Sequence, residues 1–215
     1  PYQRPPLSKA YLAGDADEES LELRTPEFYV ERNIVVIPDE KVVTVSWGAE
    51  HGVAVTDTGR ELAFDKLALT TGAAPRMLDI PGVDLDGVRT MRDLADAKGL
   101  KSHWDAIQNV VVIGGGFIGL EVAAVARKYG KNVTVLHSSD RLMRRAVGPV
   151  TSEFFKTAHE KRGATLRFNA SVCCIRGENG HVTGVELSDG EVIPADVVMV
   201  GVGAIPRTEL AEQLG

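Results

Sequence analysis

The amino-acid sequence predicts an α/β protein that contains two copies of one domain type, with the first copy incomplete. The first observation is a local pattern, in which an apolar strand at Val110–Ile113 is followed by a glycine turn at Gly114–Gly119, a helix and a second strand. The second observation is a repeat, because a hairpin-and-strand pattern in the first third of the chain recurs in the last third. The continuous apolar run at Val110–Ile113 is typical of a central parallel strand that is covered on both faces.

The composition is that of an ordinary globular protein, with 215 residues of which 44% are hydrophobic and 25% are charged. A net charge of −6 argues against nucleic acid or an anionic membrane as the main partner. No apolar run has the length that a transmembrane helix needs. The adjacent Cys173 and Cys174 match neither a zinc site nor a CxxC pair, which favours free thiols in a reducing compartment. We therefore expect a cytoplasmic protein without a metal site.

Apolar periodicity and turn residues give a coarse order of elements. The most specific turn signal is Asn179-Gly180, a hairpin sequence between two alternating segments. Helices are expected at Arg92–Ile107, Phe117–Tyr129 and Val150–Arg162, and strands at Asn33–Ile37, Val42–Trp47, Gly52–Asp57, Glu61–Thr71, Val110–Ile113, Asn132–Leu136, Val172–Glu178, His181–Leu187 and Asp196–Val202.

The internal repeat rests on six identities at a single offset, including a shared Gly-Ala-x-Pro-Arg ending. The first segment runs through Asp57-Thr58-Gly59, Asp65 and Thr71–Arg76, and the second runs through Ser188-Asp189-Gly190, Asp196 and Val202–Arg207.

The repeat predicts where the domains divide. The second copy opens with Gly114–Gly119, and the same offset places the glycine turn of the first copy before Pro1. We therefore expect a boundary near Asn109, with a partial nucleotide-binding domain over residues 1–108 and an essentially complete one over 109–215.

The glycine turn has the sequence context of a Rossmann-like dinucleotide site, because a strand precedes it and a helix follows it. In such a turn Gly114 permits the tight bend, Gly116 lets the backbone approach a pyrophosphate, and Gly119 lets the helix lie close to the strand. The pyrophosphate would bind at the helix N-terminus, where free N–H groups favour an anion. The expected cofactor-binding residues of this turn are Gly114, Gly115, Gly116, Phe117, Ile118 and Gly119.

The choice between NAD and NADP is left open by the end of the second strand. An acidic residue normally holds the ribose hydroxyls there, but Leu136 is followed by His137. His137 is compatible with a hydrogen bond to a ribose and, together with Arg141, Arg144 or Arg145, with a 2′-phosphate. A solvated charged segment explains these arginines equally well.

Two runs of sequence resemble the flavoprotein ferredoxin reductases of bacterial P450 and dioxygenase systems. These belong to the FAD-dependent pyridine-nucleotide oxidoreductase superfamily, and the group includes putidaredoxin and rubredoxin reductases. The runs are Tyr2–Leu12 together with Leu23–Pro26, and Val112–Ala123, and Arg4–Lys9 is the more discriminating. The resemblance implies two Rossmann-like domains of three-layer ββα character, each with an antiparallel β-meander insert. The first would bind FAD and the second NAD(P)H.

The resemblance also implies site residues. Lys9 would lie beside the flavin ring, and Glu121 would face the nicotinamide and pair with Lys9 when the domains close; these are the expected catalytic residues. Gly203 would offer its backbone to the nicotinamide region. The remaining residues that the resemblance assigns to FAD are Arg4, Pro5, Val42, Thr71, Gly72 and Arg89.

The activity that the resemblance implies is hydride transfer from NADH to the flavin, followed by single-electron transfer to a 2Fe-2S ferredoxin or a rubredoxin. Alternatives are an NADH oxidase or peroxidase of the same superfamily, and a nucleotide-binding redox sensor similar to apoptosis-inducing factor. An acidic partner would dock on a basic surface, for which Arg141, Arg144, Arg145 and Lys156 are candidates. The family's FAD glycine motif and its Gly-Asp flavin motif do not occur in the 215 residues, so we expect weak or no FAD binding by this chain.

Overall fold

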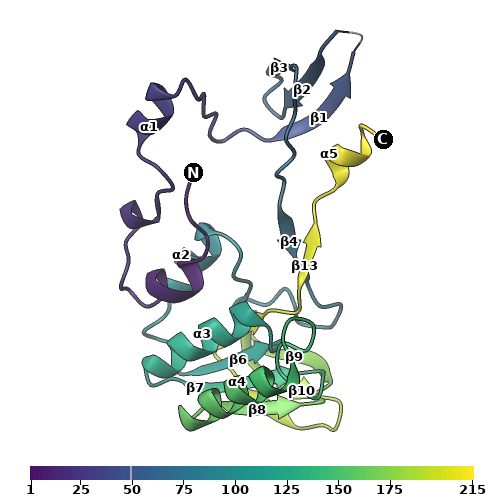
Figure 1. Cartoon of the computed structure of the whole chain (residues 1–215). Coiled ribbons are helices and arrows are strands. Elements are labelled where there is room, and N and C mark those ends of the chain that lie inside the picture. Colours follow the sequence, from purple (N-terminus) through teal and green to yellow (C-terminus); the bar gives the residue numbers. More distant parts are fainter. Residues whose placement is uncertain (49) are drawn as a thin grey trace. The chain divides into compact units, whose positions relative to one another are not determined.

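The computed structural model describes residues 1–48 and 50–215 and divides into two compact units (Figure 1). The first unit comprises Pro1–Leu23 and Pro75–Gly203, and the second comprises Arg24–Ala74 and Ala204–Gly215. The boundaries between the two units do not coincide with the boundary expected near Asn109. The reason is that Pro1–Leu23, which we call the N-terminal arm, and the connection after Pro75 both pack with the domain that contains the glycine turn. The assignment of residues 1–108 to FAD and 109–215 to NAD(P)H concerns ligands and stays a prediction.

The first unit is built on a five-stranded sheet with the order β5-β12-β6-β7-β8, in which every neighbouring pair is parallel. The predicted central strand is confirmed, since β6 pairs with β12 on one side and β7 on the other. The side chains from Val110 to Ile113 are at most 5% exposed. The strands are β5 (Val88–Arg89), β6 (Asn109–Ile113), β7 (Asn132–His137), β8 (Thr165–Phe168) and β12 (Val197–Val200).

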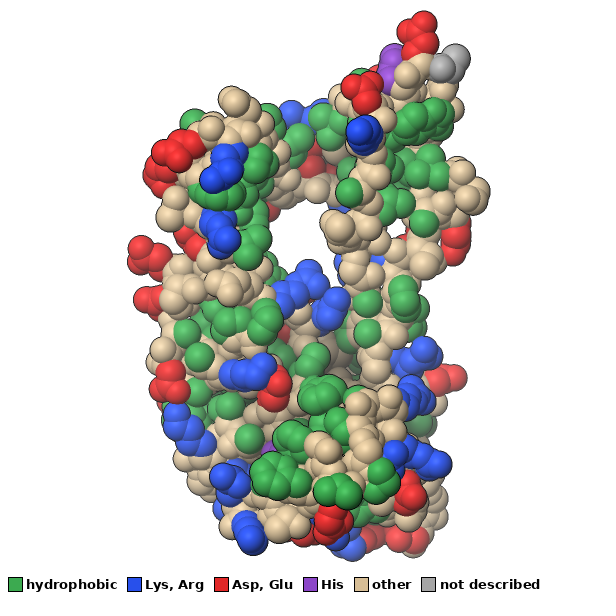
Figure 2. Space-filling view, viewed as in Figure 1, with side chains coloured by type: hydrophobic (Ala, Val, Ile, Leu, Met, Phe, Trp, Pro, Cys, Tyr) green, Lys and Arg blue, Asp and Glu red, His purple; other side chains and the backbone are tan. Residues whose placement is uncertain are grey.

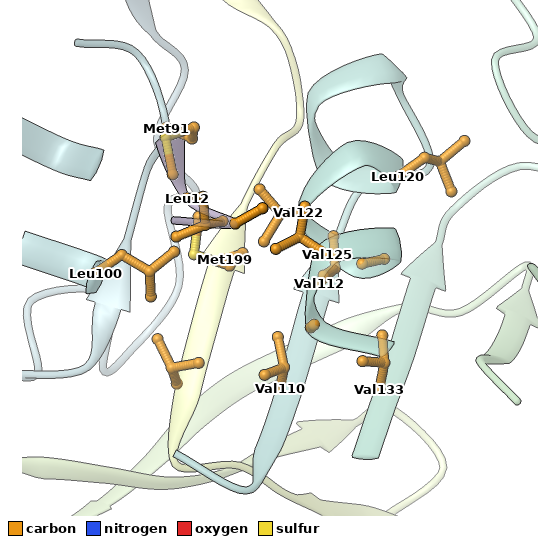
Figure 3. Close-up of a cluster of buried hydrophobic side chains, with 14 of the residues drawn as sticks. Leu12, Met91, Leu100, Val110, Val112, Leu120, Val122, Val125, Val133 and Met199 are labelled. Carbon is orange, nitrogen blue, oxygen red and sulfur yellow. The ribbon is translucent and has the colours of Figure 1, made fainter. Parts of the chain in front are cut away.

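Helices cover one face of this sheet, and the apolar residues between the layers form the larger core (Figure 3). Successive strand residues point to opposite faces, so Val110 and Val112 meet the helices while Val111 and Ile113 do not. Figure 3 shows side chains from β6, β7 and β12 facing Leu120, Val122 and Val125 of the neighbouring helix. The helical elements of this unit are η1 (Leu7–Tyr11, a π-helical turn), η2 (Glu19–Leu21), α2 (Leu94–Lys101), α3 (Phe117–Lys128) and α4 (Pro149–Lys161).

An antiparallel meander covers the opposite face and completes the predicted three-layer ββα architecture. It consists of β9 (Val172–Glu178), β10 (His181–Leu187) and β11 (Val192–Pro194). The two longer strands have the bounds that the sequence predicts, because Asn179 and Gly180 both adopt positive φ values, 52° and 84°, as a tight hairpin turn requires.

The second unit contains another antiparallel meander, with the order β1-β2-β3. This arrangement matches the insert that the sequence predicts for the first copy. Its elements are α1 (Pro26–Glu31), β1 (Val42–Trp47), β2 (Gly52–Thr56), β3 (Glu61–Phe64) and α5 (Glu209–Glu212). No helix in the described part of the chain is long and apolar enough to cross a membrane.

The repeat is visible in the hydrogen bonds of the two copies. The amide of Gly59 donates to Thr56, and at the same offset the amide of Gly190 donates to Leu187, each bond being 3.0 Å. The shared endings form strands β4 (Ala73–Pro75) and β13 (Ala204–Pro206), which pair with each other. The sequence similarity therefore corresponds to equivalent local structures.

One predicted strand is absent and another is shorter than predicted. Residues 34–37 have no regular structure, and Val35 is 84% exposed, because no strand among the described residues pairs with this segment. The strand expected over Glu61–Thr71 ends at Phe64, and both Leu67 and Leu69 beyond it are partly exposed.

The helix predicted over Arg92–Ile107 is shorter, since α2 spans Leu94–Lys101. The side chain of Asp93 caps its start by accepting a hydrogen bond from the Asp96 amide at 3.0 Å. Beyond Lys101 the chain continues in turns that still bury Trp104 and Ile107, so the apolar spacing in this segment reports burial rather than helix.

Candidate functional site

The first unit contains a cavity of about 580 Å³ at the carboxyl ends of β6, β7 and β12. The chain runs from β6 outward through β7 to β8, while β12 lies on the other side of β6, so the direction of winding reverses between β6 and β12. Parallel α/β sheets bind ligands at such a switch point. The cavity is lined by Ile113–Phe117, Leu136–Ser139, Met143–Ala146 and Gly201–Gly203, with Arg76–Ile80 and Ala170–Val172.

The glycine turn forms one wall of this cavity, and two of its glycines are required by packing. Gly114 has a φ of +115°, and a Cβ there would lie 2.3 Å from the carbonyl oxygen of Gly201. A Cβ on Gly119 would lie 2.5 Å from the carbonyl oxygen of Gly114. These two positions hold β6, β12 and α3 close together, as the sequence predicts.

Gly116 also lines the cavity, but its packing leaves room for a side chain. A Cβ there would have no atom nearer than the Gly201 carbonyl oxygen at 3.9 Å. Gly116 is also the N-cap residue of α3, and no side chain caps that end. Free N–H groups of the helix N-terminus therefore lie beside a backbone surface without side chains, and this geometry fits the pyrophosphate of a dinucleotide.

His137 lines the cavity but uses both ring nitrogens inside the protein. Its Nδ1 accepts a hydrogen bond from the amide of Gly115 at 3.2 Å, and its Nε2 donates to the carbonyl of Arg141 at 3.0 Å. Burial lowers the pKa of His137, which favours the neutral ring that this pattern needs. His137 therefore ties the glycine turn to the loop after β7, and a bond to a ribose would require one of these contacts to break.

The arginines after β7 have separate roles. Arg141 donates to the carbonyls of Val147 at 2.7 Å and Arg144 at 3.0 Å, so it shapes the loop. Arg144 and Arg145 line the cavity. Arg144 forms an exposed ion pair with Asp140 at 3.3 Å.

Lys9 and Glu121 form the ion pair that the resemblance implies. The Nζ of Lys9 lies 2.9 Å from Oε1 of Glu121, and the hydroxyl of Ser8 donates to Oε2 at 2.5 Å. The Nζ of Lys9 also donates to the carbonyl of Pro5 at 3.2 Å. All four residues belong to the first unit, so the pair forms without the domain closure that we expected. Neither Lys9 nor Glu121 lines the glycine-turn cavity.

The other residues assigned by the resemblance are dispersed. Arg4 and Pro5 are exposed and precede η1, whereas Val42, Thr71 and Gly72 belong to the second unit. The hydroxyl of Thr71 donates to the carbonyl of Arg207 at 2.6 Å, and Gly72 has a φ of +70°. The FAD-binding roles of these residues stay predictions.

Arg89 and Gly203 lie at different cavities. Arg89 pairs with Asp86 at 2.5 Å and lines a second cavity of about 270 Å³ that also includes His103 and His181. Gly203 lines the glycine-turn cavity, next to the ends of β6 and β12.

The residues proposed for partner docking lie on a mixed surface. Figure 2 shows basic and acidic side chains interspersed on the visible face, with apolar side chains at the surface over α4. The exposed apolar residues of α4 include Val150 and Phe154, and Lys156 on the same helix pairs with Glu153 at 3.2 Å. The docking role stays a prediction.

Sequence reasoning missed two contributors to these sites. Ser8 holds Glu121, and its place beside Lys9 in the Arg4–Lys9 run was a usable signal. No sequence pattern indicated that residues 76–80 would line the cavity, since they belong to a connection without apolar periodicity.

Comparisons with known proteins agree with this geometry. A family model described as pyridine nucleotide-disulphide oxidoreductase matches residues 1–215. Rhodocoxin reductase of Rhodococcus erythropolis is 44% identical over 100% of the chain, and rubredoxin-NAD(+) reductase of Pseudomonas putida is 41% identical over 99%. The crystal structure of the ferredoxin reductase for the CYP199A2 system of Rhodopseudomonas palustris covers 99% of the chain with a TM-score of 0.93 and 40% identity.

A further solved structure, the covalent complex of putidaredoxin reductase with putidaredoxin, covers 100% of the chain with a TM-score of 0.92 and 38% identity. The chain spans about half the length of the curated relatives it matches, namely 50% of rhodocoxin reductase and 55% of rubredoxin-NAD(+) reductase. It also spans 52% of each of the two solved reductase chains.

Proposed function

Since this chain belongs to the pyridine nucleotide-disulphide oxidoreductase family, we propose that it is part of an FAD-dependent NAD(P)H:ferredoxin or NAD(P)H:rubredoxin oxidoreductase. The observation that carries the proposal is the glycine-turn cavity, where Gly116 and the uncapped end of α3 offer backbone to a pyrophosphate. The names of the relatives, which are rubredoxin, rhodocoxin and ferredoxin reductases, support the same activity.

When bound, the cofactors would supply the redox chemistry, with hydride donation from NAD(P)H and single-electron release from FAD. The chain contributes binding and orientation. Gly114 and Gly119 fix the turn, Gly116 admits the pyrophosphate, and Gly203 borders the same cavity.

On the flavin side, the fit rests on charge and on a held carboxylate. Arg4, just before η1, and Lys9, within it, present exposed cationic groups, which suits an anionic cofactor. Ser8 and Lys9 contact both oxygens of Glu121, which holds this carboxylate in one orientation. The proposed roles are a flavin contact for Lys9 and a nicotinamide contact for Glu121.

The proposed electron acceptor is an iron–sulfur ferredoxin of the 2Fe-2S type or a rubredoxin, in a P450 or dioxygenase system. The named putidaredoxin complex supports a small redox-protein partner. The free thiols of Cys173 and Cys174 support a cytoplasmic location. Both cysteines lie in β9, outside η1, so the oxidase or peroxidase alternative, which uses a flavin-adjacent cysteine, has no support from them.

The test uses the full-length protein that contains this chain. It should purify with flavin absorbance, lose that absorbance when NAD(P)H is added without oxygen, and regain it when an oxidised 2Fe-2S ferredoxin or a rubredoxin is added. A colourless protein, or a reduced flavin that reoxidises only with oxygen, would overturn the proposal; the second result would instead support the oxidase alternative.

A further inference from the structure

The adenosine end of the glycine-turn cavity differs from the usual NAD site. In Rossmann-like sites an acidic residue at the end of the second strand binds the ribose 2′-hydroxyl, whereas an arginine nearby accommodates a 2′-phosphate. Here the second strand is β7, and its end and the residues after it, His137, Ser138 and Ser139, all line the cavity. The only carboxylate among the lining residues is Asp79, which comes from the connection that follows β4.

His137 does not replace the missing carboxylate. Its Nδ1 is taken by the Gly115 amide and its Nε2 by the Arg141 carbonyl. The ring therefore adds no charge and no free acceptor to the cavity. Its two hydrogen bonds instead fix the position of the loop after β7.

The loop after β7 carries mainly arginine and serine side chains. Residues 138–147 contain Asp140 as their sole carboxylate, against the three guanidinium groups of Arg141, Arg144 and Arg145. Arg141 is committed to two backbone carbonyls, which holds the loop in place.

Arg144 and Arg145 remain available to a ligand. Arg144 is 60% exposed, and its ion pair with Asp140 is exposed and long, so a stronger anion can compete for it. Arg145 lines the cavity and makes no hydrogen bond or ion pair within the part of the chain that the structure describes. Ser138 and Ser139 line the same cavity and add hydroxyl donors, and we call these two serines together with Arg144 and Arg145 the rim.

We infer that this rim is a 2′-phosphate site and that the chain takes NADPH in preference to NADH. The phosphate would be bound by Arg144 and Arg145, with Ser138 and Ser139 as hydroxyl donors. A phosphate carries nearly two negative charges at neutral pH and pairs strongly with guanidinium groups, whereas a 2′-hydroxyl is neutral and forms no ion pair with them. The inference rests on the proposed function, because it concerns the coenzyme of the same site.

Binding of two nucleotides without a reactive nicotinamide tests it directly. We expect calorimetric titration of the full-length protein to give at least tenfold tighter binding of 2′,5′-ADP than of 5′-AMP. Arg144→Gln and Arg145→Gln should each weaken 2′,5′-ADP at least fivefold and change 5′-AMP less than twofold. Arg167→Gln is the matched control, since Arg167 is an exposed arginine paired with Glu191 outside the cavity, and it should change neither affinity.

The outcomes separate the inference from the function. If 5′-AMP binds as tightly as 2′,5′-ADP, or more tightly, the phosphate site is overturned while nucleotide binding stands. If both arginine variants weaken the binding of 2′,5′-ADP and of 5′-AMP by the same factor, the arginines do not recognise the 2′-phosphate and the inference also fails. If neither nucleotide binds to the unmodified protein, the proposed function fails together with the inference.

Discussion

Two glycines at helix starts have the same backbone conformation but different surroundings. Gly116 precedes α3 with φ −89° and ψ 178°, and Gly148 precedes α4 with φ −70° and ψ 167°. Alanine adopts both conformations without strain. A Cβ on Gly148 has no neighbour within 4 Å, and one on Gly116, which lines the cavity, has its nearest neighbour at 3.9 Å. The pair therefore separates the demands of coenzyme binding from those of folding.

We predict that Gly116→Ala lowers the affinity for NAD(P)H at least tenfold, about 1.4 kcal/mol, because the added methyl group occupies the approach of the pyrophosphate. Unfolding by urea should show little change in stability. Gly148→Ala is the control and should leave coenzyme affinity unchanged. Equal affinity of Gly116→Ala and the unmodified protein would show that no pyrophosphate approaches this residue.

His137 makes stability depend on pH. Burial lowers the pKa of His137 in the folded state, while in the unfolded chain it has its ordinary value near 6.5. The unfolded state therefore binds a proton more readily, so this contribution is complete above about pH 6.5 and decreases as the pH falls below it. Protonation of Nδ1 would also remove the acceptor for the Gly115 amide.

We predict that the free energy of unfolding falls between about pH 7.5 and about pH 5.5, and that His137→Asn reduces this fall. Urea denaturation at both pH values measures it. His159 needs a parallel variant, His159→Asn, because burial lowers the pKa of His159 as well. An unchanged pH dependence in His137→Asn would contradict the prediction.

At the scale of the element, the sequence determined the outcome wherever the cause is local. The hairpin between β9 and β10 has the predicted bounds, because Asn179-Gly180 admits one tight turn and thereby sets the register. The glycine turn was predictable where its contacts are local, because a Cβ on Gly119 would meet Gly114 and Val112 of the same turn and strand, whereas the contact of Gly114 with Gly201 comes from a distant part of the chain.

The presence or absence of a neighbouring strand explains where the strand predictions failed. Residues 66–69 and 197–200 occupy equivalent positions in the repeat, but only the second set forms a buried strand. Val197–Val200 pair with both β5 and β6, whereas residues 66–69 have no paired neighbour among the described residues. An apolar run indicates that a segment is able to be buried. Whether the segment becomes part of a sheet depends on the strands beside it.

The same distinction between local and long-range causes limits how much of the candidate site the sequence predicts. The residue type at position 137 was visible in the sequence, but its two hydrogen bonds depend on a backbone amide and a carbonyl that the fold brings together. The pairing of Lys9 with Glu121 came from a resemblance, and the structure adds that one compact unit holds both residues.

At the scale of the whole molecule, the two units differ in how much apolar surface they bury. The first unit has a core on each face of its parallel sheet. In the described residues of the second unit, the buried hydrophobic side chains are Val45 and Ala54. Local opening needs less free energy where few apolar contacts are lost, so the units should differ in their resistance to opening.

We predict that the amides of β1, β2 and β3 exchange with solvent deuterium at least tenfold faster than those of β6, in a protein of residues 1–215. All of these residues lie in hydrogen-bonded strands, so the comparison separates the effect of burial from that of secondary structure. Exchange followed by mass spectrometry of peptides measures it. The N-terminal arm is the internal reference: η1 buries Leu7 and Tyr11 in the core of the first unit, and its amides should exchange nearer to those of β6. Equal protection of the two strand segments would show that the units open together, and that the sparse core of the second unit does not set its stability.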